Sequence, residues 1–438
     1  MRKWMIAASL AALAVEAPTL AQAPDRALHD AVARDYSTNL AALFDHFHRN
    51  PELSAREVQT SARMAQELRA LGYEITTGVG GTGVVAVLRN GAGPTVMLRA
   101  DMDGLPLEER SGVPNPSRVR QTDRAGVEQP VMHACGHDVH ITALVGTARQ
   151  MIARRGNWSG TLILIAQPAE ETISGARAML EDGLYTRFPK PDYALAFHVA
   201  AELPAGRIDV SETIVASSAD TVSIRVNGVG THGAYPHLGV DPVTIASQIV
   251  VSLQSMVGRS ISPLQGAVIS VGSIHGGVKG NIIPDHVDLV MTVRADTPEV
   301  RRQLLDGIDR VARGTAIALG ASEAQLPVVT RAANEMTPPT INDAATARRV
   351  RAAIAGAMGP ERMIDRVRTG MGAEDFAYFV TPESGVRGVY FNVGGTAPER
   401  IATAAGHHSP LFRIEPEPAV TAGVEAMVVA AEALFRRP

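Results

Sequence analysis

The segment VMHACGHDVH, residues 131–140, contains the only cysteine of the chain, Cys135, together with three histidines. A thiolate and imidazoles favour a borderline divalent ion such as zinc, with manganese, cobalt or nickel as alternatives. Bound metal would keep the thiol deprotonated and occupied, which gives the lone cysteine a function. The alternative is a nucleophilic Cys135 with a histidine base. The Cys-Gly-His spacing places both side chains on one short loop, and this favours ligation.

Carboxylates and one further histidine lie at the ends of apolar runs that have the composition of buried strands. They are Asp101 and Asp103 after TVMLRA (95–100), Glu170 and Glu171 after TLILIAQ (161–167), and His198 in DYALAFHV (192–199). Ligands of open α/β sheets bind outside the carboxyl ends of the strands, so these side chains are predicted to meet at one edge. Taken singly, each could instead be a helix cap or a surface charge.

The adjacent pair Glu170 and Glu171 predicts a division of labour. In an extended chain neighbouring side chains point in opposite directions, so one carboxylate can bind metal while the other faces a bound water. A metal lowers the pKa of that water, and the free carboxylate can then take its proton. The alternative is a pair of solvated loop charges, but the pair directly follows a buried strand. The residues therefore indicate metal-dependent hydrolysis.

The elements that must position these residues are those of an α/β fold. From about residue 83, short apolar runs alternate with amphipathic segments, which predicts a parallel sheet with helices on both faces. Helices are expected over 61–72 and 141–156, each ending at a glycine. The pattern resumes after about residue 340, so the catalytic domain is predicted in two parts, 24–212 and 336–438.

Residues 213–335, between these two parts, follow a different pattern. Strands are predicted at 220–228, 266–274, 287–295 and near 326–331, and helices at 241–257 and 298–320. The order βαββαβ is that of a compact split βαβ sandwich. The sequence thus predicts a larger α/β catalytic domain, split by an inserted βαββαβ domain that serves as a lid or dimerisation domain.

Residues 1–23 have the features of an export signal. Arg2 and Lys3 precede an apolar run at 4–15, and small residues near the end allow cleavage after Ala21 or Ala23. The run is too short for a permanent membrane helix, and the alternative is a buried N-terminal helix. We expect an exported protein, periplasmic or secreted. The net charge of −4 offers no basic surface, so neither nucleic acid nor, after signal removal, a membrane is an expected partner.

Several longer motifs occur in the order expected for one family. They are HRNPELSAREVQTS (48–61), RADMDGLPLEE (99–109), VMHACGHDVH (131–140), AQPAEETISGARAMLEDGL (166–184), THGAYPHLGVDP (231–242), GGVKGNIIPD (276–285), MGAEDFAYF (371–379) and HHSPLF (407–412). Through them the chain resembles the dinuclear-metal amidohydrolases and peptidases, in the branch of aminoacylases, hippurate hydrolase and the plant auxin-conjugate hydrolases. The segment 110–130 is longer than is usual there, and its polar character predicts a surface loop.

The resemblance implies a role for each matching residue. Two divalent ions would be bridged by Cys135, with the remaining ligands His137, Glu171, His198 and His408. Glu170 would be the general base that later protonates the leaving amine, with Asp103 steering a ligand from behind. 

Three further residues belong to the inserted domain. By the same resemblance His232 would stabilise the oxyanion, in its own chain's site or in that of a partner subunit, and Asn281 would hold the substrate near its carboxylate. From the residues alone, His232 could be a surface histidine and Asn281 a turn residue. Arg294 could neutralise a substrate carboxylate or form an ordinary ion pair on a strand.

The predicted function is metal-dependent hydrolysis of the amide bond of N-acyl amino acids, with zinc or manganese as the favoured metal. The small-molecule substrate could instead be a peptide, cleaved by a dipeptidase or carboxypeptidase with the same site. A non-catalytic metal- or peptide-binding protein is a third alternative, which the presence of Glu170 disfavours. The inserted domain is also the candidate interface of a homodimer.

Overall fold

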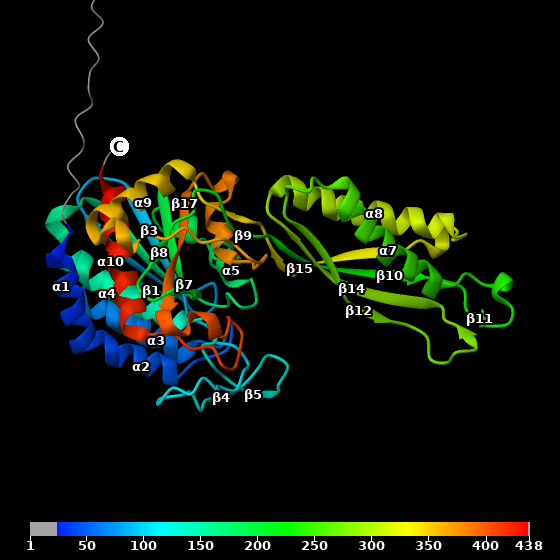
Figure 1. Cartoon of the computed structure of the whole chain (residues 1–438), viewed down its shortest axis with the longest axis horizontal. Helices are drawn as coiled ribbons and strands as arrows, with labels where there is room; N and C mark the ends of the chain where they lie inside the picture. Colours follow the sequence, from blue (N-terminus) through cyan, green and yellow to red (C-terminus); the bar gives the residue numbers. More distant parts are fainter. Residues whose placement is uncertain (1–23, 437–438) are drawn as a thin grey trace, which may run out of the picture.

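The computed structural model describes residues 24–436, so the predicted export signal lies outside the described residues. Its catalytic domain is built on a seven-stranded sheet (Figure 1). In spatial order the strands are β1 (Glu74–Val79), β2 (Gly83–Asn90), β6 (Gly160–Gln167), β3 (Thr95–Asp101), β7 (Tyr193–Pro204), β17 (Arg387–Thr396) and β8 (Ile208–Asp209).

The sheet is mixed, which corrects the expectation of a parallel one. Strands β6, β3, β7 and β17 run parallel, while β1, β2 and β8 pair antiparallel at the two edges. The apolar run at 84–88 lies in β2, whose partner β1 is connected to it by a tight turn, and such a turn requires antiparallel pairing. The four parallel strands still end at a common edge.

Helices cover both faces of this sheet, as predicted. One face packs against α1 (Arg26–Asp35), α2 (Ala41–Arg49), α3 (Val58–Ala70), α4 (His137–Ala153), α9 (Ala344–Met358) and α10 (Pro416–Phe435). The other packs against α5 (Gly175–Glu181), α6 (Leu184–Arg187) and the 3₁₀ helix Asp375–Val380. Alternate residues of β2 enter the two cores, with Val84 and Ala86 on one side and Val85 and Val87 on the other.

Helix α10 is long and apolar enough to cross a membrane by composition alone. In this fold 83% of the apolar stretch of α10 is buried inside the protein. It packs against α4, which is itself buried along almost its whole length. The two helices therefore form the centre of the catalytic core.

The inserted domain has the predicted βαββαβ order. Its elements are β10 (Ala219–Asn227), α7 (Pro242–Ser260), β12 (Ala267–His275), β14 (His286–Ala295), α8 (Pro298–Ala318) and β15 (Val328–Thr337). The sheet order is β12-β14-β10-β15, and α7 and α8 pack on one face of it. The predicted limits, residues 213 and 335, fall one residue before β9 (Ile214–Ala216) and two residues short of the end of β15.

Two small ribbons complete the architecture. β4 (Arg120–Thr122) and β5 (Glu128–Pro130) form a hairpin within the polar segment 110–130. β11 (Thr231–His232) pairs with β13 (Ile282–Ile283) at the end of the inserted domain that lies farthest from the catalytic sheet (Figure 1). β9 pairs with β16 (Thr340–Ile341) where the chain passes between the two domains.

Candidate active site

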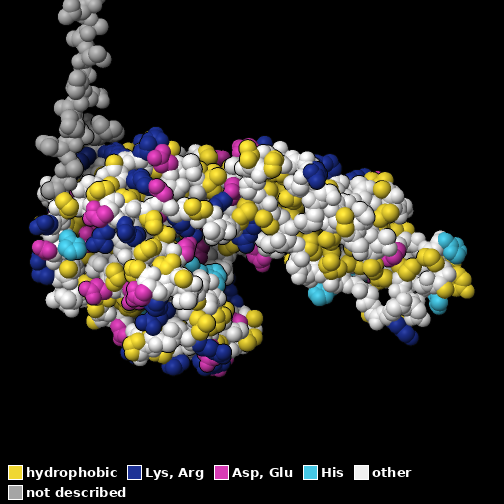
Figure 2. Space-filling model, in the orientation of Figure 1, with side chains coloured by type: hydrophobic (Ala, Val, Ile, Leu, Met, Phe, Trp, Pro, Cys, Tyr) yellow, Lys and Arg dark blue, Asp and Glu magenta, His cyan; other side chains and the backbone are white. Residues whose placement is uncertain are grey.

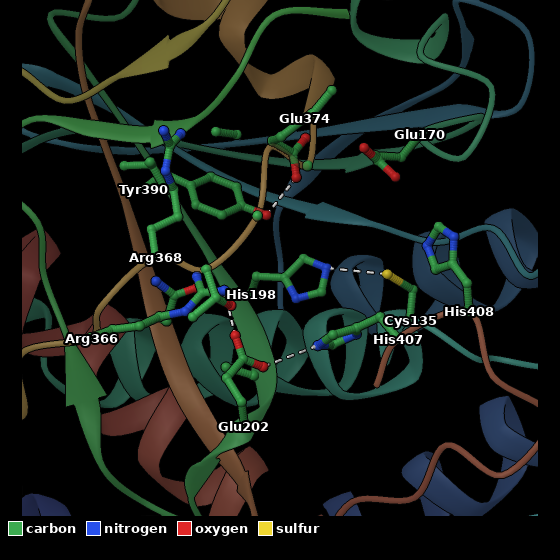
Figure 3. A pocket seen from close by; sticks show the side chains of 18 of the residues that line it. Cys135, Glu170, His198, Glu202, Arg366, Arg368, Glu374, Tyr390, His407 and His408 are labelled. Carbon is green, nitrogen blue, oxygen red and sulfur yellow. Dashed lines mark hydrogen bonds and ion pairs between the residues drawn. The ribbon is translucent and has the colours of Figure 1, made fainter. Parts of the chain in front are cut away.

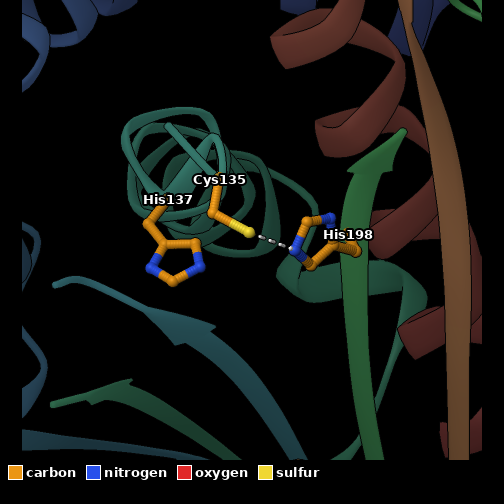
Figure 4. Close-up of side chains that lie close together, drawn as sticks. All are labelled: Cys135, His137 and His198. Carbon is orange, nitrogen blue, oxygen red and sulfur yellow. Dashed lines mark hydrogen bonds between the residues drawn. The ribbon is translucent and has the colours of Figure 1, made fainter. Parts of the chain in front are cut away.

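The five predicted metal ligands converge at the carboxyl edge of the parallel strands. Donor atoms of Cys135, His137 and His198 lie within 4.8 Å of one another, and so do those of Cys135, Glu171 and His408. The Cys135 Sγ lies 3.4 Å from His198 Nε2 (Figures 3 and 4). His408 Nε2 lies 3.2 Å from Glu171 Oε2. Residues separated by more than 270 positions in the sequence thus form one cluster.

Gly136 makes the Cys-Gly-His turn possible. Its φ of +83° lies in the left-handed region, which glycine adopts without steric cost. A Cβ at this position would lie 2.2 Å from a methyl group of Val199 on β7. The glycine therefore allows the loop to pass close to β7, with Cys135 before the turn and His137 at the first position of α4.

Each of two histidines presents one free ring nitrogen to the cluster. His137 Nδ1 lies 2.8 Å from the carbonyl oxygen of Asp103, and His198 Nδ1 lies 2.7 Å from the carbonyl oxygen of Val199. A carbonyl only accepts, so both Nδ1 atoms carry the proton and both Nε2 atoms have a free lone pair. This is the tautomer that a metal-ligating histidine needs.

The donor set fits a divalent cation. Buried His137 Nε2 and Glu171 Oε1 have no hydrogen-bond partner in the described chain, although buried polar atoms are usually paired. Burial, followed by the charges of Glu171 and Glu170, raises the pKa of the Cys135 thiol well above its ordinary value. A thiolate here requires a compensating positive charge. The five donors are one thiol, three imidazoles and one carboxylate, a set that would accept zinc or a similar ion.

Asp103 forms hydrogen bonds with the backbone that carries the acidic residues of the cluster. Its side chain accepts hydrogen bonds from the backbone N–H groups of Glu170 at 3.1 Å and Glu171 at 3.0 Å, and from the hydroxyl of Ser54 at 2.6 Å. It also lies 3.4 Å from His137 Nδ1. Asp103 therefore orients the backbone of two acidic residues and lies next to one histidine.

Glu170 is buried next to the ligand cluster. One of its carboxylate oxygens lies within 4.8 Å of donor atoms of His137 and Glu171. Burial, then the charge of Glu374 and that of Glu171, raises the pKa of Glu170 well above its ordinary value. The carboxyl group is not paired with any cation among residues 24–436, so it is free to exchange a proton.

Asp101 and His140 form a further group with His137, but their atoms are already engaged. Asp101 bonds to Arg99 at 2.5 Å and to His140 Nδ1 at 2.5 Å. His140 Nε2 accepts the N–H of Val199 at 2.9 Å. The pair therefore anchors α4 to the sheet.

A buried acidic network behind Glu170 was not predicted. The fully buried Arg99 donates to Glu374 at 2.7 Å and lies 3.1 Å from Asp375, and the hydroxyl of Tyr390 donates to Glu374 (Figure 3). Carboxylate oxygens of Glu170, Glu374 and Asp375 come within 4.8 Å of one another. The motif MGAEDFAYF contained both acidic residues, but nothing in its spacing assigned them a role.

The ligand cluster lies in a cleft of about 590 Å³. Arg294 of β14 lines this cleft together with Cys135, Glu170 and His198, so the inserted domain forms part of its wall. Arg294 has no ion pair with a carboxylate in the described part of the chain and donates only to Thr292 Oγ1 at 3.1 Å. The strand ion pair considered from the sequence is thus not formed. Figure 2 shows the hollow between the two domains, with acidic and histidine side chains at its margin.

His232 and Asn281 lie outside this cleft. His232 belongs to β11, and the N–H of the following Gly233 bonds to the carbonyl of Asn281 at 2.8 Å. Both residues are at the far end of the inserted domain (Figure 1). The structure therefore brings them together with each other but not with the cleft of their own chain. Arg366 and Arg368, which no motif singled out, do line the cleft.

The chain belongs to the peptidase family M20/M25/M40, whose model matches residues 97–433. Over 275 residues it is 40% identical to a hippurate hydrolase of Campylobacter jejuni, covering 62% of this chain and 68% of that protein. Over 369 residues it is 34% identical to IAA-amino acid hydrolase ILR1-like 2 of Arabidopsis thaliana, covering 84% and 79%. These matches confirm the predicted family and place the chain among metal-dependent hydrolases.

A carboxypeptidase and a solved structure are also similar. Thermostable carboxypeptidase 2 of Saccharolobus solfataricus is 34% identical over 372 residues, covering 84% of this chain and 88% of that one. The crystal structure of the YXEP protein of Bacillus subtilis is described as a dinuclear metal-binding peptidase from the M20 family. It superimposes with a TM-score of 0.74 at 28% identity, covering 94% of this chain and 99% of that one. The predicted fold class is thereby confirmed.

Proposed function

We propose that this protein hydrolyses the amide bond of N-acyl amino acids with the aid of two divalent metal ions. The observation that carries the proposal is the position of Glu170, a buried carboxyl group with no cationic partner among residues 24–436, beside five converging donor residues. Arg294 lies in the same cleft and forms no ion pair in the described part of the chain, so it supplies a partner for the carboxylate of an amino-acid product. Hippurate and IAA-amino acids, after which two relatives are named, are N-acyl amino acids.

Cys135, His137, Glu171, His198 and His408 would hold the ions, with Cys135 shared between them and zinc or manganese favoured over cobalt or nickel. When bound, such ions polarise the amide carbonyl and acidify water. Glu170 takes the proton of the attacking water at its carboxylate and passes it to the nitrogen of the leaving amine. Arg294 orients the substrate through its carboxylate, so that the amide reaches Glu170.

The oxyanion would be stabilised by His232, and Asn281 would contact the substrate, both from a second copy of the chain. Their distance from the cleft of their own chain supports this arrangement. The inserted domain also exposes apolar side chains on α7 and on its edge strand β12, including Val251 at 58% and Ile274 at 55% exposed. Such a surface, next to an unpaired strand edge, suits a homodimer interface.

The carboxypeptidase relative makes peptide hydrolysis the second candidate. A panel of N-acetyl, N-benzoyl and N-indoleacetyl amino acids, together with dipeptides and N-blocked dipeptides, separates the two. Amine release would be measured with added zinc or manganese and again after chelation. Chelator-sensitive release from acyl amino acids supports the proposal, and cleavage of peptides alone replaces it with a peptidase. No release by the metal-loaded protein contradicts both.

We also propose that the protein is exported and acts in the periplasm or outside the cell, since residues 1–23 have the composition of a cleaved signal. Fractionation of the producing cells, combined with N-terminal sequencing of the mature protein, tests this. A mature N-terminus at Gln22 or Pro24 supports it, and an intact Met1 in the cytoplasmic fraction contradicts it.

A further inference from the structure

The turn that carries the acidic pair is held by two buried carboxylates. Asp103 accepts the N–H groups of Glu170 and Glu171, as described above. The preceding N–H group, that of Ala169, donates to Glu57 Oε1 at 2.8 Å. Three consecutive backbone N–H groups of the turn are therefore bound to carboxylates from two separate segments. Glu57 lies at the start of α3, far from the metal ligands in sequence.

This turn has an unfavourable backbone conformation. Ala169 has a φ of +52° and Ile173 a φ of +53°, both in the left-handed region that side chains with a Cβ rarely adopt. Each such residue costs about 1 kcal/mol or more and persists only where surrounding contacts enforce it. At Ala169 the N–H group donates to Glu57, and the carbonyl accepts the N–H groups of Ser174 and Gly175.

Glu57 is fully buried, and its hydrogen bonds all go to uncharged groups. Oε1 also accepts the N–H of Ala55 at 2.7 Å, and Oε2 accepts the hydroxyl of Thr82 at 2.6 Å. Ala55 is itself left-handed, with a φ of +59°. Within residues 24–436 no cation lies within ion-pair distance of this carboxylate. A buried, unpaired carboxylate is costly, so Glu57 is poorly explained as a source of stability alone.

We propose that Glu57 is a positioning residue for the general base. By accepting the N–H groups of Ala55 and Ala169, it joins the N-terminal segment to the turn and fixes the left-handed backbone that places the carboxylate of Glu170. This inference rests on the proposed function of Glu170. It assigns Glu57 an effect on the reaction step, with no direct contact to substrate or metal.

The test compares Glu57→Ala with Glu57→Gln. A glutamine oxygen can still accept both N–H groups, and its amide group can donate to Thr82. We expect Glu57→Ala to lower kcat by about 10- to 100-fold, with KM and metal content near wild type, because small misplacements of a reacting group have effects of this size. Glu57→Gln should retain most of kcat. The control is Glu67→Ala on the same helix, which removes only the ion pair with Arg63 near the surface and should leave kcat unchanged.

Ala169→Gly provides a second, independent readout. Glycine adopts positive φ freely, so the double variant Glu57→Ala, Ala169→Gly should recover part of the lost kcat. If Glu57→Ala does not fold, Glu57→Asp replaces it, because it retains the charge but withdraws the oxygens from Ala169. Its kcat should fall in the same way, and Ala169→Gly should rescue it.

Two outcomes would overturn the inference. One is a folded Glu57→Ala or Glu57→Asp variant with wild-type kcat, which reduces Glu57 to a structural residue. The other is an equal loss of metal content and kcat, which would place its effect on the ligands. The wild-type protein is assayed first: if it releases no amine from any substrate while loaded with metal, the proposed function fails. A loss confined to the Glu57 comparison leaves that function standing.

Discussion

The rings of His137 and His198, two of the proposed metal ligands, are oriented by hydrogen bonds within the protein. Each Nδ1–H is bound to a backbone carbonyl, so each Nε2 lone pair points into the cluster without further rearrangement. Because folding already fixes the orientation of the rings, metal binding need not restrict them further, and this increases the affinity for metal. Cys135 differs, because its thiol must lose a proton among carboxylates that raise its pKa. Cys135 therefore needs a bound ion to become a thiolate, and the ion in turn needs that thiolate as a ligand.

Cys135→Ser tests this dependence. Serine keeps the size of the side chain, but its hydroxyl is a much poorer ligand for zinc than a thiolate is. We expect the purified variant to lose at least one of two metal equivalents, with turnover reduced by about 100-fold or more. Metal content by atomic emission provides the measurement. Unchanged metal content would remove Cys135 from the site.

Glu170→Gln separates binding from chemistry. Glutamine retains the size of the side chain but cannot take a proton, and Glu170 is not one of the five ligands. Turnover should fall by about 100- to 10,000-fold while two metal equivalents and KM are retained. Metal analysis and steady-state kinetics on the same preparation decide the result. Wild-type kcat would show that another group is the base.

For individual residues, the sequence predicted site residues that follow strands better than it predicted the buried carboxylates that hold those residues in place. Glu170, Glu171 and His198 could be placed together because the carboxyl ends of parallel strands share an edge, whereas His408 was assigned only through the family resemblance. Glu57 and Glu374 could not, since their contacts with the site join segments more than 100 residues apart and follow no period. His232 had a predicted role, but only the fold shows how far it lies from its own cleft.

At the scale of elements, periodicity predicted the strands and helices of both domains but not the direction of every strand. β2 has the composition of a parallel, fully buried strand, yet it pairs antiparallel with both β1 and β6, because the turn after β1 and the connection 91–94 to β3 are too short for the crossover that parallel strands need. The ribbon of β11 and β13 has two residues in each strand, too few for any alternating pattern to be visible. Both outcomes depend on connections rather than on composition.

Gly136→Ala should disrupt the start of α4. The new Cβ would meet the Val199 side chain at 2.2 Å and would sit at a φ of +83°. We expect a loss of about 2–4 kcal/mol in unfolding free energy and a lower metal content, since both neighbours are proposed metal ligands. Gly112→Ala is the matched control, because Gly112 has a φ of +77° but no atom within 4 Å of a Cβ. Equal losses in the two variants, measured by denaturant unfolding, would show that packing on Val199 is unimportant.

His48 joins α2 to the first turn of α4 and to the loop before the β4–β5 hairpin. Burial by itself lowers its pKa, but the hydrogen bond with Asp138 at 2.8 Å and the nearby carboxylate of Glu109, 3.4 Å from Nε2, prevail and raise the pKa to about 10. The folded pKa exceeds the ordinary value of about 6.5, so this stabilisation is complete below pH 6.5 and is lost as pH rises through 10.

His48→Gln should therefore lower the unfolding free energy by about 1–3 kcal/mol at pH 6, and the difference from wild type should shrink towards pH 10. Urea unfolding of both proteins at these two pH values provides the measurement. His46→Gln on the same helix is the control, because His46 forms no ion pair in the described structure. A difference that stays constant with pH would mean that His48 is neutral in the folded protein.

For the whole molecule, residues of the inserted domain must combine with the cleft of the catalytic domain to form one active site. Arg294 lines the cleft from the inserted domain of its own chain, whereas His232 and Asn281 lie at the far end of that domain and do not line the cleft. The proposed homodimer resolves this difference, since a twofold axis would exchange the far ends of the inserted domains. Each cleft would then contain Glu170 from one chain and His232 from the other.

Mixing two inactive variants tests this arrangement directly. His232→Ala and Glu170→Gln should each be nearly inactive as homodimers. A mixed dimer has one cleft with both defects and one cleft with neither, because the intact Glu170 of the first chain meets the intact His232 of the second. Random co-assembly after co-expression should restore about a quarter of wild-type activity. Mixing His232→Ala with Cys135→Ser should do the same, whereas Glu170→Gln with Cys135→Ser should not, since both defects are on one side of the cleft. No recovery in the first two mixtures would mean that each chain completes its own site.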